Sequence, residues 1–241
     1  MRPNLAIVVP VFDEERCIET VLREWQPAVS EVEPNYCFLS FDDGSTDRTR
    51  ALIDGWAALQ KPGTCHVVSR PNVGHGQTCL EGYRAACDLG AEWILQIDSD
   101  GQCDPKYFAE LWAKRHGHDV VYGKRVKRMD GWKRVLATKL VRLVVHFASG
   151  ADCIDANVPY RLMRTQHLRP LVDSIPPDFD LANIALAVQI KRVCWREAVV
   201  PIVFRRRAGR EASVPLKRFA AKARELIAQL KSLPQSDAAR S

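Results

Sequence analysis

The feature that most restricts the fold of this chain is a regular alternation, in its first half, of short apolar segments with longer segments of helical periodicity. The apolar segments are four to six residues long and are bounded by Pro, Gly, Asp or Asn, which is typical of buried strands. Strands that alternate with helices predict an α/β fold with a doubly wound, mostly parallel sheet. The expected strands are residues 5–9, 36–41, 65–68, 93–97 and 119–122.

Start and stop signals delimit the helices between these strands. Ser45 and Thr46 precede one helical segment, and Asp104 is placed to cap another that begins at Pro105. Pro27 is expected to stop the first helix, because proline lacks the backbone N–H. The expected helices are residues 14–25, 47–60, 76–89 and 105–116.

The alternation stops after residue 123, and the second half is helical and basic. Apolar residues at helical spacing predict helices at 131–149 and 180–192, and one more strand is expected at 198–204. Leucine, alanine and phenylalanine residues on one face predict a basic amphipathic helix at 215–233.

Composition, with 46% hydrophobic and 27% charged residues, excludes a disordered, collagen-like or coiled-coil chain. A chain of 241 residues can bury a large core without metal or disulfides, and its eight cysteines include no C-x-x-C pair, so they are expected to be reduced and mostly buried. The longest apolar run, 140–148, is too short to cross a membrane. The first residues lack the features of a signal peptide, which makes the cytoplasm the expected compartment.

The net charge of +6 hides an asymmetry along the chain. Residues 1–105 carry 8 Lys and Arg against 17 Asp and Glu, whereas the rest carries 27 against 12. This predicts an acidic pocket for a cation in the first half and a basic surface for phosphates in the second. Charge alone leaves nucleic acid and anionic lipid open as partners.

The sharpest motif follows the strand at 93–97, where Asp98, Asp100 and Gln102 alternate beyond the strand end. Two carboxylates and an amide oxygen suit Mg2+ or Mn2+ and leave coordination positions for the diphosphate of a nucleotide. The alternative is a solvated turn, for which Asp-Ser-Asp-Gly is well suited.

Three further polar segments follow or precede strand ends. In residues 41–47 a buried carboxylate can accept hydrogen bonds from a base or ribose, or Ser45 or Thr46 can cap the next helix; the two interpretations are compatible. Residues 9–15 and the glycine-containing loop 70–78 are weak signals alone. His75 in that loop is a weak candidate for a general base.

Together these segments resemble the nucleotide-sugar-binding half of family-2 glycosyltransferases with the GT-A fold, a Rossmann-like architecture, and most closely the polyprenyl-phosphate sugar transferases such as dolichol-phosphate mannose synthase. The resemblance implies an inverting enzyme with a divalent cation, Mg2+ or Mn2+, held by Asp98, Asp100 and Gln102. It implies a nucleotide-sugar site formed by Pro10, Phe12, Glu14, Phe41, Asp43, Ile97, Asp98, Ser99, Arg125 and Arg206.

The second half matches the family less evenly. Arg125 stands in a G-x-R position, and Arg206, with Arg207 as the alternative in register, stands in R-x-x-G. Residues 155–161 resemble D-x-x-S-G-F-R but contain Val-Pro in place of Ser-Gly. The usual Ser-Lys after the glycine of R-x-x-G is also missing, since Arg-Glu stand there.

The acceptor decides the mechanism. A sugar hydroxyl needs a carboxylate base, for which Asp178 and Asp180 are the candidates. A lipid phosphate is already anionic and needs only placement and charge stabilisation, with Asp100 and Arg125 as catalytic residues. The many cations between residues 125 and 142 favour the second class.

The expected organisation is one catalytic domain, 1–210, with a donor half at 1–123 and an acceptor half at 124–210, followed by a basic helix and tail at 211–241. The helix either lies on the cytoplasmic face of a membrane or packs on the domain. A separate membrane protein is a further partner to consider. The rival functions are transfer to a hydroxyl acceptor and a non-catalytic nucleotide-sugar-binding subunit; nucleic-acid binding is not expected, because no recognition motif accompanies the cations.

Overall fold

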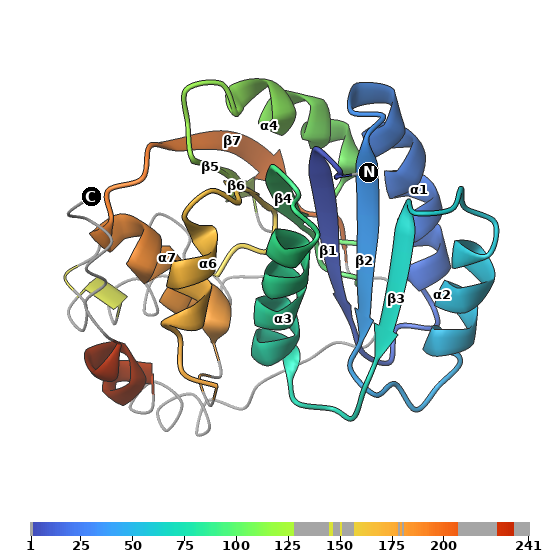
Figure 1. Cartoon of the computed structure of the whole chain (residues 1–241), viewed down its shortest axis with the longest axis horizontal. Helices are drawn as coiled ribbons and strands as arrows, with labels where there is room; N and C mark the ends of the chain where they lie inside the picture. The colour runs from blue at the N-terminus through green and yellow to red at the C-terminus, as the bar shows by residue number, and fades with distance from the viewer. Residues whose placement is uncertain are drawn as a thin grey trace.

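The computed structural model describes residues 2–127, 145–146, 150, 157–177, 179, 181–206 and 226–233 (Figure 1). In this part of the chain, seven strands form one sheet in the order β3-β2-β1-β4-β6-β5-β7. Every strand is parallel to the others except β6, which runs antiparallel to β4 and β5. The strands are β1 (Leu5–Val11), β2 (Tyr36–Asp42), β3 (Cys65–Ser69), β4 (Trp93–Gln96), β5 (Val120–Lys127), β6 (Arg161–Arg164) and β7 (Glu197–Val203).

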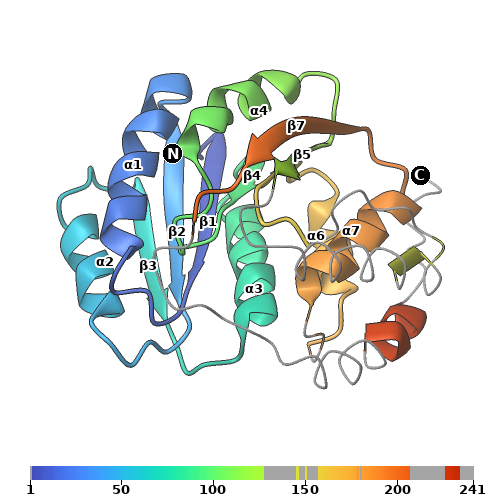
Figure 2. The same ribbon diagram turned by 180° about the vertical axis from the view of Figure 1, so that it is seen from behind.

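Helices cover both faces of the sheet (Figures 1 and 2). One face packs against α1, α2 and α4, and the other against α3, α6 and α7. This is the doubly wound, mostly parallel α/β fold expected from the sequence. The helices are α1 (Ile18–Val32), α2 (Thr49–Ala57), α3 (His75–Asp88), the short 3-10 helix η1 (Pro105–Tyr107), α4 (Phe108–Lys114), α6 (Leu168–Asp173) and α7 (Ala182–Arg192).

Strand β1 shows why its sequence is a continuous apolar run. Ala6 and Val8 belong to the apolar cluster beneath α3, α6 and α7. Leu5, Ile7 and Val9 belong to the cluster beneath α1, α2 and α4. Because successive side chains of a strand point to opposite faces, a central strand covered on both sides is apolar at every position.

The prediction that α1 stops before Pro27 is wrong. The helix continues through Pro27 to Val32, and it buries Trp25 and Val29 on the same face as its first turns. A proline inside a helix costs about 3 kcal/mol, whereas full burial of one large apolar side chain contributes roughly 1.5–3 kcal/mol. Tertiary packing on both sides of the proline therefore outweighs the local signal.

Strand β6 and helix α6 have no counterpart in the sequence-based prediction. β6 begins with Arg161, whose side chain is completely buried. Its guanidinium donates to the carbonyl oxygens of Val158, at 3.0 and 2.6 Å, and of Asn183, at 3.2 Å. A charged residue thus stands inside a buried strand, and this concealed the apolar pattern by which strands are recognised.

Most of the expected helix at 131–149 and most of the expected helix at 215–233 lie outside the described residues. In the described part of the latter, Leu226, Leu230 and Leu233 are buried in the same apolar cluster as α6 and α7. Arg192 of α7 also donates to the carbonyl of Leu233 at 3.3 Å. For residues 226–233, packing on the domain is therefore the interpretation that fits. No helix within the described ranges is long and apolar enough to span a membrane.

Candidate active site

The parallel order of the sheet brings the sequence motifs to one edge. Strands β2, β1 and β4 are neighbours, and their carboxyl ends lead into residues 42–47, 12–15 and 97–102. Because β5 and β7 run in the same direction as β4, Arg125 and Arg206 also lie toward this edge. We call it the carboxyl edge; it is where open α/β sheets bind their ligands.

The D-x-D-x-Q turn begins where β4 ends. Ile97 is fully buried, and Ser99 and Asp100 are nearly so, whereas the side chain of Asp98 is 28% exposed. The backbone N–H of Gln102 donates to Asp100 at 3.0 Å, and Gly101 takes a positive φ of 76°. The turn is therefore held by its own acidic residue, in a backbone conformation that suits glycine.

The chemistry of this turn fits a hard divalent cation. Gln102 donates its Nε2 to the carbonyl of Arg205 at 3.3 Å, which leaves its Oε1 as the oxygen that can act as a ligand. Among the residues that the structure describes, no three His, Cys, Asp or Glu side chains converge on one point. Two carboxylates and one amide form a partial ligand set of the kind that Mg2+ or Mn2+ completes with phosphate oxygens and water.

Asp43 holds the loop that precedes α3. Its side chain is 3% exposed, and its two oxygens accept from the backbone N–H groups of Val73, at 3.0 Å, and Gly74, at 2.9 Å. The guanidinium of Arg70 lies 3.7 Å from the same carboxylate. The expected contact of Asp43 with a base or ribose stays a prediction; the structure gives it a role in fixing the loop.

Gly44 lets this loop come close to the end of β2. Its φ is +76°, and a Cβ at this position would lie 2.8 Å from the backbone nitrogen of Asn72. The preceding Asp42 accepts from the hydroxyl of Ser69 at 2.7 Å and from the N–H of Ser45 at 3.1 Å. This position therefore requires glycine both for its φ and for space.

The prediction that Ser45 or Thr46 caps the following helix is wrong. Helix α2 begins only at Thr49, and the two residues bond instead to the loop after β1. The hydroxyl of Ser45 accepts from the N–H of Asp13 at 3.0 Å, and the N–H of Thr46 donates to the Asp13 carboxylate at 2.7 Å. Asp13 adopts a φ of 50°, which is uncommon for an L-residue and which these bonds hold in place.

The next two residues extend this connection between the loops. Glu14 donates its N–H to the hydroxyl of Thr49 at 2.8 Å. Glu15 donates its N–H to Asp47 at 3.2 Å and accepts from the N–H of Arg48 at 3.2 Å. The loops after β1 and β2 therefore form one hydrogen-bonded unit, which holds the expected nucleotide-binding residues in fixed relative positions.

Cys17 joins the first motif to the D-x-D turn, and nothing in the sequence pointed to it. Its buried thiol lies 3.0 Å from the Oε2 of Glu14 and 3.4 Å from the carbonyl of Ser99. Glu14 itself is 7% exposed. A small side chain with a weak donor is thus packed between two of the motifs expected to bind the nucleotide.

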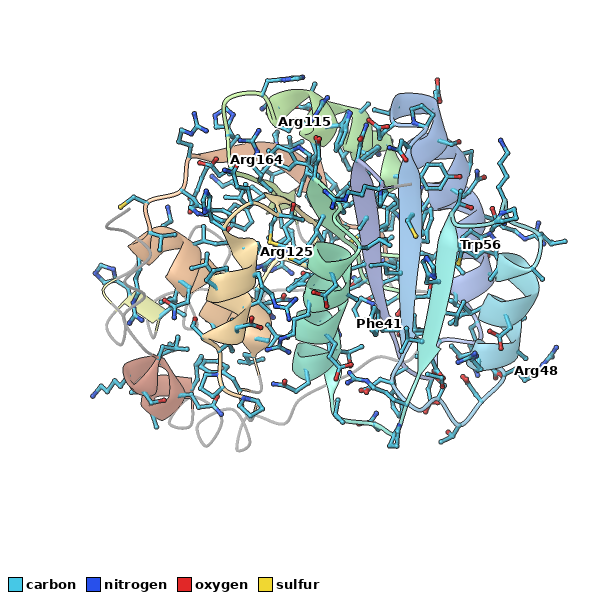
Figure 3. All side chains as sticks on the ribbon, in the orientation of Figure 1. Phe41, Arg48, Trp56, Arg115, Arg125 and Arg164 are labelled. Atoms are coloured by element: carbon cyan, nitrogen blue, oxygen red, sulfur yellow. The ribbon has the colours of Figure 1, made fainter. Side chains whose placement is uncertain are left out.

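The apolar residues assigned to the nucleotide site differ in accessibility. Phe12 is 45% exposed, whereas Phe41 is 4% exposed and packs in the core (Figure 3). Pro10 is also buried, within β1. Of these three, Phe12 is the one whose ring a ligand can contact directly.

Arg125, labelled in Figure 3, lies near the carboxyl end of β5. Its guanidinium stands 5.3 Å from the ring centroid of Phe204. Arg206, two residues beyond that ring, is exposed. Arg125 lies in the last part of β5 and Arg206 follows β7, and both strands are parallel to β4, so both arginines lie toward the same edge as the D-x-D turn. The other candidate catalytic residues, Asp178 and Asp180, lie outside the described residues.

A chain of polar contacts runs from the D-x-D turn, through the partly exposed His75, into the core. The Nε2 of His75 lies 3.9 Å from Asp98 and 3.5 Å from the thiol of Cys79, which accepts from Gln96 at 3.5 Å. Gln96 in turn accepts from the hydroxyl of Tyr83. The pKa of His75 is raised, mainly by its contact with Cys79 and more weakly by Asp98 and Asp100.

Comparisons with known proteins agree with this geometry. A family model described as glycosyl transferase family 2 matches residues 6–173. A curated relative, undecaprenyl-phosphate 4-deoxy-4-formamido-L-arabinose transferase of Aeromonas hydrophila subsp. hydrophila, is 28% identical over 172 residues, which cover 71% of this chain and 51% of the relative. The protein of the same name from Proteus mirabilis (strain HI4320) is 24% identical, with the same two coverages. The chain thus spans about half the length of these relatives.

Solved structures share the fold. Glucosyl-3-phosphoglycerate synthase from Mycobacterium tuberculosis, in complex with UDP, superposes with a TM-score of 0.67 at 21% identity, covering 97% of this chain and 82% of that one. Its complex with Mn2+, UDP and phosphoglyceric acid gives 0.67 at 20% identity, with coverages of 97% and 80%. The resemblance seen in the sequence motifs is therefore confirmed, and this chain belongs to glycosyl transferase family 2.

Proposed function

We propose that this chain transfers a sugar from a nucleotide diphosphate sugar to a polyprenyl phosphate, with inversion at the anomeric carbon. The observation that carries the proposal is the convergence, at one sheet edge, of an acidic D-x-D-x-Q turn with Arg125 and Arg206. The names of the curated relatives support a lipid-phosphate acceptor. Their match is to about half of their length, so the acceptor belongs to the proposal.

The donor occupies the connected loops after β1, β2 and β4. Phe12 offers an exposed ring to the base or ribose, and Asp43 and Glu14 hold the surrounding loops. Asp98, Asp100 and Gln102 hold the divalent cation, Mg2+ or Mn2+, which when bound stabilises the negative charge of the departing diphosphate. A neighbour of the same fold crystallised with Mn2+ and UDP supports a divalent ion.

The acceptor phosphate lies on the side of Arg125 and Arg206. A phosphate oxygen is already anionic near neutral pH, so attack on the anomeric carbon needs no base, and the arginines place and partly neutralise the incoming group. Direct displacement inverts the configuration. The lipid brings the reaction to a membrane surface, and we place the enzyme at the cytoplasmic face, either alone or with a membrane protein as partner.

The proposed catalytic unit is residues 1–210, divided into a donor half, 1–123, and an acceptor half, 124–210. Residues 211–241 form the tail. Burial of Leu226, Leu230 and Leu233 against the domain supports a packing role for the last part of the tail helix. Contact with the membrane is then left to the basic residues of the acceptor half.

The test is a transfer assay with purified protein, Mn2+ or Mg2+, and UDP- and GDP-sugars. Undecaprenyl and dolichyl phosphates in detergent are offered in one series and soluble hydroxyl acceptors in another. We expect lipid-linked product from the phosphates alone, and unchanged turnover in Asp178→Asn and Asp180→Asn. Product from hydroxyl acceptors alone, lost in either variant, would assign a base-dependent transferase. Nucleotide-sugar binding without transfer to any acceptor would leave a binding subunit.

A further inference from the structure

The segment that follows β7 is bonded to the D-x-D-x-Q turn. The N–H of Arg205 donates to the carbonyl of Gln102 at 3.0 Å, and the Gln102 side chain donates back to the carbonyl of Arg205 at 3.3 Å. Two residues before Arg205, the N–H of Val203 donates to the hydroxyl of Tyr107 at 3.1 Å. We call residues 203–206 the latch.

The side chain of Arg205 secures the latch to two other elements. Its Nη2 lies 3.1 Å from Asp104, which closes the D-x-D-x-Q turn, and its Nη1 contacts Glu24 of α1. Lys106 also reaches Asp104, at 3.2 Å, but from the adjoining helix η1, two residues along the chain. Of these two cations, Arg205 is therefore the one that connects the turn to α1 and to the end of β7.

The latch also lies beside both arginines assigned to phosphate binding. The ring of Phe204, which is 8% exposed, lies 5.3 Å from the guanidinium of Arg125. Arg206 is the next residue after Arg205. A displacement of the latch would thus move Gln102, Arg125 and Arg206 together.

We propose that Arg205 is a positioning residue, which holds the D-x-D-x-Q turn in the geometry that binds the divalent cation. This inference deepens the proposed function and rests on it. Two carboxylates, those of Asp104 and Glu24, engage the guanidinium of Arg205, whereas Arg206 is assigned to phosphate binding. Arg205 therefore acts on the metal site through Gln102 and Asp104. Removal of a group that orients metal ligands typically weakens metal binding by about 10- to 100-fold.

The chain contains a matched control at the other end of the same strand. Arg196 precedes β7, and its guanidinium pairs with both oxygens of Asp119, at 3.1 Å each. Its side chain is 62% exposed, compared with 40% for Arg205. Both residues flank β7 and pair with aspartate, but only Arg205 is bonded to the D-x-D-x-Q turn.

The first experiment measures Mn2+ binding by electron paramagnetic resonance in the presence of UDP, and separately of GDP, without acceptor. In Arg205→Ala we expect Mn2+ affinity to fall about tenfold, with Arg205→Lys intermediate because lysine lacks the fork that spans Asp104 and Glu24. Arg196→Ala should bind as the wild type does. Equal affinity in Arg205→Ala and the wild type would overturn the inference.

Hydrogen exchange supplies a readout that does not depend on nucleotide or activity. Arg205→Ala should speed exchange in peptides covering 98–104 and leave those covering 119–123 unchanged, and Arg196→Ala should do the reverse. If the wild type fails to bind Mn2+ both in the presence of UDP and in the presence of GDP, the proposed function fails. The exchange pattern still tests the latch in that case. Unaltered exchange at 98–104 in Arg205→Ala would reject the latch itself.

Discussion

The two edges of the sheet use the same kinds of residue in different ways. At the carboxyl edge, Asp13 and Asp43 accept hydrogen bonds from the backbone of neighbouring loops. At the opposite, amino edge, Arg196 pairs with Asp119 near the surface, and Arg115 and Arg164 lie over the rings of Trp112 and Trp93 (Figure 3).

This difference separates positioning from stability. A carboxylate that binds loop backbone determines where other groups of the site lie, so its loss should change binding and turnover. An exposed ion pair contributes roughly 0–1 kcal/mol to stability and positions little else. Substitutions at the carboxyl edge should therefore act on activity, and matched substitutions at the amino edge should act weakly on stability alone.

The largest effect is expected at the D-x-D turn. Asp98→Asn or Asp100→Asn should lower kcat/KM for transfer by at least about a hundredfold, because a Lewis acid contributes several kcal/mol of charge stabilisation. Thermal unfolding should change little in Asp98→Asn, since that side chain is partly exposed. Asp119→Asn at the amino edge is the control, with turnover like the wild type. Full turnover in either turn variant would remove the metal assignment.

A pair of glycines gives the next comparison. Gly44 and Gly117 both have positive φ, +76° and +80°, but only at Gly44 would a Cβ meet neighbouring backbone. Gly117→Ala should cost about 1–2 kcal/mol for the left-handed conformation and leave the donor KM unchanged. Gly44→Ala should cost more than that and raise the donor KM, because the loop at Asn72 must move. Denaturant unfolding and initial rates measure both; equal effects of the two variants would contradict the comparison.

A smaller effect is expected from Asp43→Asn. The amide keeps one acceptor oxygen but turns an NH2 group toward the N–H of Val73 or Gly74. Loss of one charge-assisted hydrogen bond corresponds to about 1.5–3 kcal/mol, and part of it should appear as a higher donor KM as the loop before α3 loosens. The measurement is UDP-sugar affinity by calorimetry, with Asp119→Asn again as the control. Unchanged affinity would show that the loop keeps its place without the carboxylate.

The smallest effect concerns acid stability at the amino edge. Hydrogen bonds from Arg196 hold the pKa of Asp119 below its usual value. A depressed carboxyl pKa contributes stability above the unfolded value, about 3.9, and this contribution is lost as pH falls through the folded pKa. The stability difference between wild type and Arg196→Ala should thus be constant near neutral pH, under about 1 kcal/mol, and shrink below about pH 4. Urea unfolding at several pH values tests this; a difference that grows in acid would contradict it.

Local sequence predicted the first half of the fold well. Strands β1 to β4 were expected within one or two residues of their observed bounds. The side chains of β1, β2 and β4 are almost all buried, so these strands form uninterrupted apolar runs. The D-x-D-x-Q and Asp-Asp-Gly-Ser motifs were also visible, since their residues are adjacent in the chain. Parallel order then implied that they share an edge.

Contacts between distant segments were not visible in the same way. Cys17 contacts Ser99 across 82 positions, and Arg205 contacts Glu24 across 181. Cys17 belongs to no cysteine motif, and Arg205 is one of three consecutive arginines, so no sequence pattern distinguishes either residue. The cap expected from Ser45 and Thr46 failed for a related reason: the loop after β1 competes for the same groups.

The sequence by itself determined the class of fold, the parallel direction of β1 to β4 and the family, because these follow from the burial period of each segment and from short contiguous motifs. Only the tertiary structure decided that α1 continues through Pro27, that Arg161 stands inside a buried strand, and that Asp43 and Arg205 hold the loops around the site. The physical reason is that these features depend on burial and hydrogen-bond partners supplied by remote parts of the chain. Such partners can outweigh the local preference of a residue by several kcal/mol.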